Sequence, residues 1–336
     1  MEQNTTNSSY GFFGRLTAPF PSQIIIDATE ICNLACVHCP HPEFKKSEHY
    51  AGRYLEPALN EKLVHEVRDY GHQFTKYIRY TSNGEPLVHP KIFEMMGYAK
   101  AHSKVTVTLT TNGRLLKASQ RKKLIDSGVD LVDISLDANT PETYAKIRVG
   151  GDLNQTRGNV LALIDEVAKT NSPLKVVTSY VEQPGNVHET KDFEKFWNEN
   201  GSSYVVIRRL HSAAGGRPEI AEKMMQNIDL TKRTPCVYPW ERVVLGPTGK
   251  LAFCPADWTH GSSFIDYNIT TVKETWQGEF YRQLREAHLK NEYSCHKFCG
   301  QCPDWQAVRW PNEGRAYADM VEDFRREGAD VLKPQL

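Results

Sequence analysis

The chain of 336 residues lacks the features that would assign it to a membrane or to nucleic acid. No stretch reaches the roughly 18 consecutive apolar residues of a membrane-spanning helix. The first ten residues lack the basic and apolar regions of a signal peptide, so we expect a cytoplasmic protein. Lys+Arg and Asp+Glu both number 41, which gives a formal net charge of +0. Because no excess charge attracts phosphate backbones or anionic surfaces, we expect neither nucleic acid nor a membrane as partner.

Cysteine is also scarce, with 8 residues in the chain, too few for a disulfide scaffold in a protein of this length. A reducing compartment would keep these residues as thiols, so we interpret their spacing first as metal-ligand spacing. They fall into two groups, with none between them. The first group, in a C-x3-C-x2-C arrangement, is Cys32, Cys36 and Cys39. The second group lies in the C-terminal third and contains Cys236, Cys254, Cys295, Cys299 and Cys302.

Between the two groups, short β-branched segments alternate with amphipathic helical segments. The predicted strands are 23–27, 77–81, 105–110, 131–136, 176–181 and 204–208. The predicted helices are 60–70, 91–102, 116–127, 141–147 with 156–169, and 187–200. Because such strands are buried in a parallel sheet and their crossovers are right-handed, the pattern predicts an α/β fold, a partial (β/α)6 TIM-like barrel.

The sequence after the sixth strand predicts a different organisation. A Gly/Pro-rich break (Gly215, Gly216, Pro218) is followed by irregular, cysteine-containing segments. We predict an N-terminal extension, the barrel, a cysteine-containing domain, and a C-terminal helix with a tail. The corresponding residue ranges are 1–21, 22–218, 219–310 and 311–336.

Polar motifs follow the predicted strands at their C-terminal ends, where the loops of parallel α/β folds converge. The first cysteine group follows strand one, and residues 82–86 (SNGEP) follow strand two. Residues 111–113 (TNG) follow strand three, while Ser135 and Asp137 end strand four. We expect these four segments to share one mouth of the barrel.

Three cysteines within eight residues are compatible with zinc or with an iron–sulfur cluster. A closed zinc site needs four ligands, and His38 or a distant residue is the candidate for the fourth. A [4Fe–4S] cluster on three cysteines instead leaves one iron open to a substrate or cofactor. The spacing favours iron–sulfur and leaves zinc as the alternative.

The segment 32–39 (CNLACVHC) resembles the signature of the radical S-adenosylmethionine (SAM) superfamily. The segment 82–86 resembles the Gly-Gly-Glu-Pro element of that superfamily, with Asn83 where the first glycine is usual. This resemblance covers residues 22–210. It implies a [4Fe–4S] cluster on the first three cysteines, whose open iron chelates SAM. It also implies a 5′-deoxyadenosyl radical that abstracts hydrogen from a substrate.

The same resemblance implies roles for residues at the strand ends. Glu85 would accept hydrogen bonds from the SAM ammonium, and Gly84 would let the backbone pass close to the ligand. His38 would lie against adenine or the cluster edge, and Arg148 would bind the SAM carboxylate. The remaining candidates for binding SAM are Ser82, Thr110, Asn112 and Ser135. An ordinary packing, turn or solvent-exposed role stays open for each of these residues.

The second cysteine group begins around a predicted β-hairpin, with Cys236 before it and Cys254 after it. A predicted helix near 279–289 comes next, followed by the remaining cysteines. This arrangement resembles the auxiliary-cluster extension of the SPASM/twitch subfamily, and five cysteines fit the shorter twitch form. We therefore assign one auxiliary [4Fe–4S] cluster, with zinc as the alternative, to Cys236, Cys254, Cys299 and Cys302. Cys295 is surplus and becomes a candidate catalytic hydrogen donor.

These resemblances imply a radical SAM oxidoreductase with two [4Fe–4S] clusters. Only ~22 residues precede the first strand, too few for a peptide-recognition domain, so we favour a small hydroxylated substrate of sugar or aminocyclitol type. Arg208 and Arg209 are candidate catalytic residues that could bind its carboxylate or phosphate, with ordinary surface arginines as the alternative. We expect a flavodoxin or ferredoxin-type electron donor.

Oxidation by two electrons is the favoured reaction, and several alternatives stay open. The first is radical epimerisation, for which Cys295 would supply a hydrogen atom. The second is modification of a peptide by a SPASM-type enzyme. A protein that uses its clusters only for electron transfer, and a zinc-binding structural module, are the remaining alternatives.

Overall fold

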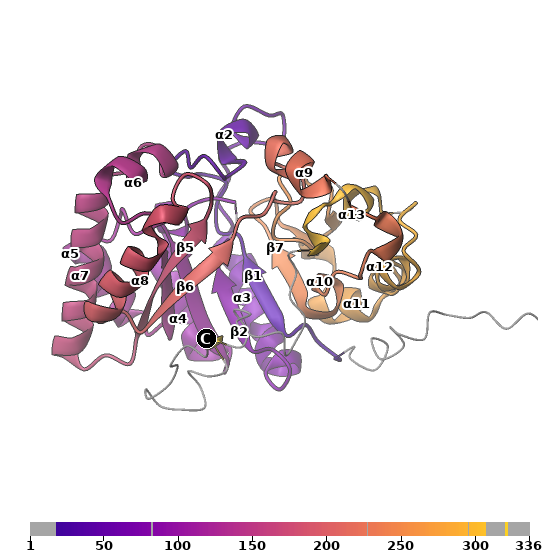
Figure 1. Cartoon of the computed structure of the whole chain (residues 1–336). Helices are drawn as coiled ribbons and strands as arrows, with labels where there is room; N and C mark the ends of the chain where they lie inside the picture. Colours follow the sequence, from indigo (N-terminus) through magenta and orange to yellow (C-terminus); the bar gives the residue numbers. More distant parts are fainter. Residues whose placement is uncertain (1–17, 82, 227, 295, 307–319, 322–336) are drawn as a thin grey trace, which may run out of the picture.

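The computed structural model describes residues 18–81, 83–226, 228–294, 296–306 and 320–321. A nine-stranded sheet runs through this part of the chain in the order β6-β5-β4-β3-β2-β1-β7-β8-β9 (Figure 1). Neighbouring strands from β6 to β7 are parallel, while β8 and β9 are added antiparallel. The strands are β1 (Gln23–Ile26), β2 (Tyr77–Tyr80), β3 (Thr106–Thr111), β4 (Leu131–Ser135), β5 (Lys175–Glu182), β6 (Tyr204–Arg209), β7 (Arg242–Leu245), β8 (Lys250–Ala252) and β9 (Ser263–Asp266).

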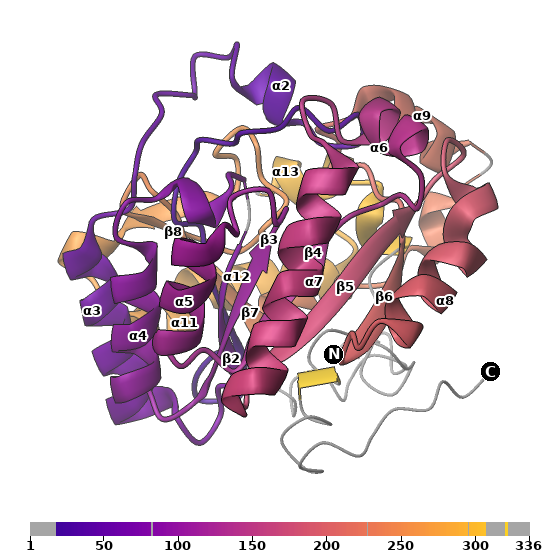
Figure 2. The same cartoon turned by 90° about the vertical axis from the view of Figure 1, so that its left-hand side faces the viewer.

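Helices cover one face of the parallel strands, as Figure 2 shows for α3, α4, α5, α7 and α8. The helices that connect strands β1 to β6 are α2 (His41–Phe44), α3 (Pro57–Glu66), α4 (Ile92–His102), α5 (Ala118–Asp126), α6 (Pro141–Ile147), α7 (Leu153–Thr170) and α8 (Thr190–Glu199). The later helices are α9 (Pro218–Met225), α10 (Tyr238–Glu241), α11 (Val272–Gln277), α12 (Glu279–Lys290) and α13 (Lys297–Gln301). This architecture confirms the predicted α/β fold, with a partial barrel and a C-terminal cysteine-containing part.

The six predicted strands are confirmed, each within one residue of its predicted ends. Local signals also explain the helix ends. Helix α7 starts at Asp152, whose side chain accepts a hydrogen bond of 3.0 Å from the Gln155 N–H group. It ends at Asn171, which adopts the left-handed conformation with φ of 50°.

The two faces of the sheet have different neighbours. Ile24 and Ile26 on β1, like Ile78 on β2, lie in the main hydrophobic core with residues of the surrounding helices. Alternation then places Ile25 on the opposite, inner face, where it packs with residues of β2, β7 and β8 and with Val321. The inner face of the parallel strands is therefore the face turned away from α3, α4, α5, α7 and α8.

The cysteine-containing part continues the sheet of the barrel. Strand β7 pairs in parallel with β1, so that Ile26 lies opposite Leu245, and β7 forms the predicted hairpin with β8. Glu66 of α3 adds a buried link, since it accepts hydrogen bonds from the Tyr267 hydroxyl (2.6 Å) and the Val272 N–H group (2.7 Å). The domain boundaries stay predictions, and most of the predicted extension and tail lies outside the described residues.

Candidate functional site

The first cysteine group lies in the loop that follows β1. Two backbone hydrogen bonds tie this loop to the end of α6, from Ala35 N–H to Val149 (2.9 Å) and from Val37 N–H to Ile147 (3.0 Å). The three thiols are largely buried and lie within electrostatic reach of one another. Burial raises the pKa of the Cys32 and Cys39 thiols to about 12, and it also raises the pKa of the Cys36 thiol. Such thiols stay protonated at neutral pH unless a metal displaces the proton.

A buried ion pair lies beside Cys36. The Arg148 guanidinium is 2.5 Å from the Asp137 carboxylate, and it also lowers the pKa of Cys36 through charge and a hydrogen bond, against the larger effect of burial. Asp137 has a positive φ of 61° at the end of β4, and its Oδ1 accepts a hydrogen bond of 2.6 Å from Val181 N–H. His38 is 3.6 Å from the same carboxylate, and burial lowers the pKa of its ring to about 4.

Glu85 is buried in the loop that follows β2, and it binds Thr111 and Asn112 at the end of β3. Its carboxylate accepts hydrogen bonds from the Thr111 hydroxyl (2.6 Å) and from the Asn112 N–H group (2.8 Å). Burial raises the pKa of Glu85, and its charge raises that of the Cys32 thiol. The carboxylate therefore lies between the first cysteine group and the end of β3.

Asn112 extends this connection back to the cysteine loop. Its Nδ2 donates a hydrogen bond of 2.7 Å to Oδ1 of Asn33, the residue after Cys32. The Nδ2 atom of Asn33 is buried and has no hydrogen-bond partner among the described residues. An unpaired buried donor at this position is suited to a ligand with an acceptor atom.

The structure gives Gly84 a reason that differs from the predicted one. A Cβ atom at this position would lie 2.0 Å from the Thr29 carbonyl oxygen and 2.7 Å from that of Ile31. The close approach is thus between the 82–86 segment and the backbone leading to Cys32. The predicted close approach to the ligand stays a prediction, and the contact between the two loops is a further reason for glycine at this position.

Two other predicted residues, Thr110 and Ser135, contact side chains of neighbouring strands. Thr110 lies on the inner face of the sheet and accepts a hydrogen bond of 2.9 Å from Arg79 Nε. The Ser135 hydroxyl lies 3.4 Å from that of Ser179 on β5. Ser82 and Cys295 lie outside the described residues.

Four cysteines of the second group come together although two of them are far apart in sequence from the others. These four are Cys236, Cys254, Cys299 and Cys302. In every pair of them, the negative charge of one thiolate raises the pKa of the other thiol, so all four lie near one another. Burial raises the pKa of Cys236 to about 12 and that of Cys302 to about 11. Arg233 lies beside them, donating to the Cys299 carbonyl (2.7 Å), and its charge partly lowers the pKa of two of these thiols.

A single zinc ion needs its ligands at about 2.0–2.3 Å. Within the residues that the structure describes, no three His, Cys, Asp or Glu side chains form a group that could hold one metal ion. Soft thiolates remain the ligand type that both zinc and iron–sulfur clusters use. The donor chemistry of the two groups, three thiols in the first and four in the second, fits the predicted [4Fe–4S] clusters.

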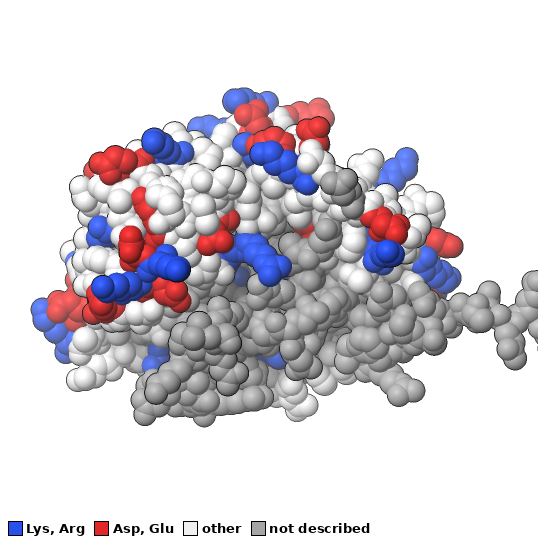
Figure 3. Space-filling model, viewed as in Figure 1, with Lys and Arg blue, Asp and Glu red and all other residues white. Residues whose placement is uncertain are grey.

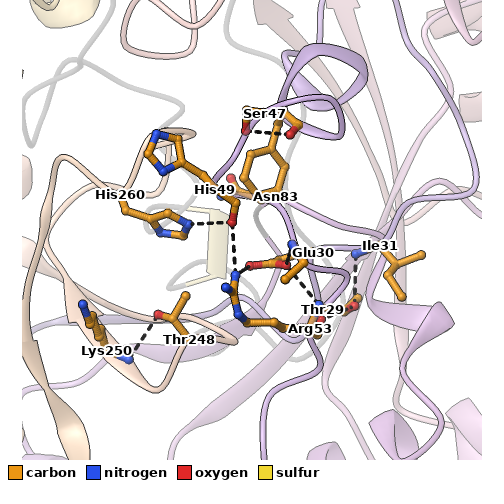
Figure 4. Close-up of polar contacts among 12 residues, drawn as sticks. Thr29, Glu30, Ile31, Ser47, His49, Arg53, Asn83, Thr248, Lys250 and His260 are labelled. Carbon is orange, nitrogen blue, oxygen red and sulfur yellow. Dashed lines mark hydrogen bonds and ion pairs between the residues drawn. The ribbon is translucent and has the colours of Figure 1, made fainter.

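A small pocket, open to solvent, lies beside Cys254, between the β7–β8 hairpin and the segments that carry Glu30 and Asn83. Its lining includes Asp27, Glu30, Asn83, Cys254, Asp257 and His260. The Asn83 side chain donates a hydrogen bond of 2.9 Å to the Asp257 carbonyl, which joins the 82–86 segment to the loop after Cys254. Figure 4 shows Glu30 held by Arg53 at this pocket, with His260 directed at the His49 carbonyl.

The two candidate arginines of β6 are on opposite faces of the strand because side chains alternate along it. Arg208 binds the buried Asp133 carboxylate of β4 at 2.5 Å, whereas Arg209 is exposed. Both signs of charge are scattered over the face of the molecule seen in Figure 3, without a large area of one sign.

Two family models match the chain. That of the radical SAM superfamily matches residues 26–195. The chain belongs to the radical SAM superfamily. A second model, that of the SPASM iron–sulfur cluster-binding domain, matches residues 236–303. Both predicted family assignments are confirmed, and with them the use of SAM, of a [4Fe–4S] cluster and of further iron–sulfur clusters. No described helix is both long enough and apolar enough to cross a membrane.

Curated relatives match part of this radical SAM chain. A probable GTP 3′,8-cyclase of Methanococcus maripaludis is 35% identical over 151 residues, which are 45% of this chain and 47% of the relative. An AdoMet-dependent heme synthase of Methanosarcina barkeri is 33% identical over 176 residues, 52% of this chain and 46% of the relative. The chain thus spans about half the length of these curated relatives.

Solved structures share the fold over more of the chain. The match to BtrN in complex with AdoMet and 2-DOIA covers 84% of this chain and 92% of the BtrN chain, with a TM-score of 0.56 and 17% identity. The match to Streptococcus suis SuiB bound to precursor peptide SuiA covers 94% of this chain and 76% of the SuiB chain, with a TM-score of 0.61 and 13% identity. At these identities the likeness shows the fold alone.

Sequence reasoning missed several residues that the fold brings to the site. Asn33, Arg79, Thr111, Asp133 and Arg233 each make the contacts described above, yet none was singled out as a site residue, although Asn33 and Thr111 lie within the 32–39 and 111–113 motifs. Asp137 was noted only as the end of a strand. The position of Asn33 directly after Cys32 was the one available signal for its role, since the remaining contacts join segments distant in sequence.

Gly84→Ala tests the contact between the two loops. The added Cβ would overlap the Thr29 carbonyl, so we expect the free energy of unfolding of the iron-loaded protein to fall by at least about 1–3 kcal/mol. We also expect loss of iron from the first cysteine group. Gly158→Ala in helix α7 is the matched control, because its Cβ would meet nothing within 4 Å. Equal unfolding curves for the two variants, with iron retained, would contradict the steric role of Gly84.

Proposed function

We propose that this radical SAM enzyme abstracts hydrogen from a small hydroxylated substrate and oxidises it by two electrons, with an auxiliary [4Fe–4S] cluster in the SPASM-like part. One observation carries the proposal: a pocket that is lined by Cys254 is also lined by Asn83, the residue before Gly84 and Glu85. A substrate bound there would lie beside Cys254 and next to the segment that carries Glu85. A reductant of the flavodoxin or ferredoxin type would supply the first electron.

In this proposal, Cys32, Cys36 and Cys39 hold the first cluster, and four later cysteines hold the second: Cys236, Cys254, Cys299 and Cys302. When bound and reduced, the first cluster supplies the electron that cleaves SAM and yields the 5′-deoxyadenosyl radical. The protein contributes thiols that would lose their protons to solvent as their sulfurs bind iron, and positive charge from Arg148 beside Cys36. Within each group one cysteine is buried, Cys36 in the first and Cys299 in the second.

The SAM-binding residues in this proposal are those around the first cysteine group. Glu85 receives the ammonium, and the hydrogen bonds from Thr111 and Asn112 fix its carboxylate in place. Asn33 offers its unpaired Nδ2 donor. Arg148, with His38 nearby, remains a candidate for the SAM carboxylate, although Asp137 already occupies part of its guanidinium.

The neighbouring proteins support different substrates. BtrN, which was solved with AdoMet and 2-DOIA, is matched over 92% of its length and supports a small molecule. SuiB, which was solved with its precursor peptide, supports the alternative of a peptide. We favour the small molecule because the polar pocket lining, with Asp27, Asn83 and His260, suits hydroxyl groups.

The direct test of this proposal measures iron and 5′-deoxyadenosine. We expect about eight irons in the reconstituted wild type, four for each cluster, and 5′-deoxyadenosine after reduction with SAM. Substituting alanine at Cys32, Cys36 and Cys39 should halve the iron and abolish 5′-deoxyadenosine. Substituting alanine at the four auxiliary ligands should also halve the iron, while leaving SAM cleavage. Zinc in place of iron, or iron unchanged by the first set, would refute these ligand assignments.

Glu85→Gln tests the binding of SAM. We expect binding weakened by ~1.5–3 kcal/mol, the usual range for hydrogen bonds to a charged group, with the iron content intact. The control is Thr111→Val, which removes one donor to Glu85 but keeps the carboxylate. If both variants lose SAM affinity equally in anaerobic calorimetry, Glu85 acts only by positioning the loop. Unaltered affinity in Glu85→Gln would remove it from the site.

Turnover in heavy water separates oxidation from epimerisation. Oxidation gives a product that lacks two hydrogens and needs no donor, so Cys295→Ala should stay active. Epimerisation gives an isomer that gains solvent deuterium, and Cys295→Ala should abolish it with both clusters intact. Mass spectrometry of the products decides between these outcomes, and the second would overturn our preference for oxidation.

A further inference from the structure

Arg242 is a cation beside the second cysteine group that the proposed function leaves without a role. It is the first residue of β7 and follows Cys236 by six residues. In the hairpin that β7 forms with β8, Val244 lies opposite Ala252. Arg242 comes two residues before the first member of this pair, and Cys254 comes two residues after the second. Arg242 and Cys254 therefore both lie at the open end of the hairpin.

Tyr238 connects Arg242 to the cysteines. The Arg242 guanidinium lies over the Tyr238 ring, with its carbon 3.7 Å from the ring centre. The backbone N–H group of Tyr238 donates a hydrogen bond to the Cys236 sulfur. Burial, together with the charges of Cys236 and Cys254, raises the pKa of the Tyr238 hydroxyl to about 12. Tyr238 thus lies between Arg242 and two predicted ligands of the auxiliary cluster.

No close ion pair among the described residues neutralises Arg242. The carboxylate that they place beside it is that of Glu241, 3.9 Å from Arg242 Nε, and this carboxylate also accepts a hydrogen bond of 2.9 Å from Gln23. The Arg242 Nε atom is buried and has no hydrogen-bond partner in the described part of the chain. The Arg242 side chain is only 19% exposed, so solvent screens its charge little.

Arg233 supplies a second positive charge to the same group. Its Nη2 atom donates to the Cys299 carbonyl (2.7 Å), and its Nη1 atom donates to the Gly300 carbonyl (3.2 Å). Its guanidinium carbon lies 4.2 Å from the centre of the Tyr293 ring. Carbonyl groups and aromatic rings bind a guanidinium without neutralising it.

Negative charges near the second group are bound by hydrogen-bond donors. Asp257 and Asp304 lie within electrostatic reach of Cys299 and Cys302, respectively. The Asp257 carboxylate accepts backbone N–H groups of residues 259, 261 and 262. The Asp304 carboxylate accepts those of residues 212 and 214. These donors partly offset the two negative charges.

The first cysteine group has a different charge balance. Its arginine, Arg148, lies 2.5 Å from the buried Asp137 carboxylate, which offsets much of its positive charge. Burial raises the pKa of Cys32, and the negative charge of Glu85 raises it further. The reduction potential of an iron–sulfur cluster depends on the charge around it, and positive charge favours the reduced, more negative state. The surroundings of the second group therefore favour reduction more than those of the first.

We propose that Arg242, together with Arg233, raises the reduction potential of the auxiliary cluster above that of the first cluster. This inference rests on the proposed function, in which the auxiliary cluster accepts an electron. The 5′-deoxyadenosyl radical takes a hydrogen atom from the substrate carbon that bears a hydroxyl group. The hydroxyl then loses its proton to solvent, the carbonyl forms, and the remaining electron passes to the oxidised auxiliary cluster. Arg242 acts through the cluster, as a positioning residue.

The test measures the reduction potential of the auxiliary cluster in the full-length, iron-loaded chain. Every protein in this series carries alanine at Cys32, Cys36 and Cys39, so that electron paramagnetic resonance during a reductive titration reports one cluster. Arg242→Gln should make the cluster about tenfold harder to reduce, a downward shift of about 59 mV for one electron. Arg242→Lys keeps the positive charge and should restore most of the potential.

Glu241→Gln is the second variant, because it removes a negative charge that acts on Cys236. We expect it to shift the potential upward, which general damage to the cluster would not do. Arg282→Gln on α12 is the charge-matched control, since its side chain is 56% exposed and pairs with glutamates of its own helix. An unchanged potential in Arg242→Gln, an equal shift in Arg282→Gln, or a downward shift in Glu241→Gln would overturn the inference. If Arg242→Gln loses its iron, the sign of the Glu241→Gln shift decides.

The potential of the first cluster is measured in the complementary protein, which carries alanine at the four auxiliary ligands. We expect this potential to be the lower of the two, and a higher value would also overturn the inference. These titrations contain no SAM or substrate, so they decide the inference separately from the proposed function. Absence of 5′-deoxyadenosine from the wild type would instead count against the proposed function.

Discussion

The parallel pairing of β1 on both of its sides is the constraint on which the rest of the structure depends. Because Ile26 lies opposite Tyr80 on β2 and opposite Leu245 on β7, all three strands end at one edge of the sheet. The first cysteine loop, the 82–86 segment and the hairpin leading to Cys254 therefore meet there. The β1–β7 pairing, together with the hydrogen bonds of Glu66 and Asn83 to the C-terminal part, thus fixes the second cysteine group relative to the first.

The fold could be predicted because its signals are local. Each strand is a short β-branched run, and helix ends such as Asp152 and Asn171 carry their own capping signals. The motifs of the site were visible for the same reason, since cysteine spacing is a short-range pattern. The pairing of β7 with β1 could not be predicted, because the residues that meet are more than 200 positions apart and neither strand encodes its partner.

The roles of single residues were harder to predict than their proximity. Gly84 stands out in the sequence, yet only the fold reveals that Thr29 and Ile31 leave no room for a side chain there. Arg148 likewise could be placed near the first cysteine group, but its pairing with Asp137 depends on the left-handed turn that ends β4. Steric and electrostatic neighbours of this kind arise from tertiary packing, which a single sequence does not specify.

Both cysteine groups have an arginine side chain beside their thiols. Each brings several thiols into a buried region, and deprotonated thiolates would be strongly disfavoured there without compensating charge. Arg148 lies beside Cys36, and Arg233 lies beside Cys299 and Cys302, where each guanidinium favours the thiolate form. Arg79 and Arg208 differ in that both bind one buried carboxylate, that of Asp133. The guanidinium groups beside the cysteines therefore favour thiolates, whereas those on the inner face of the sheet favour the ionised form of Asp133.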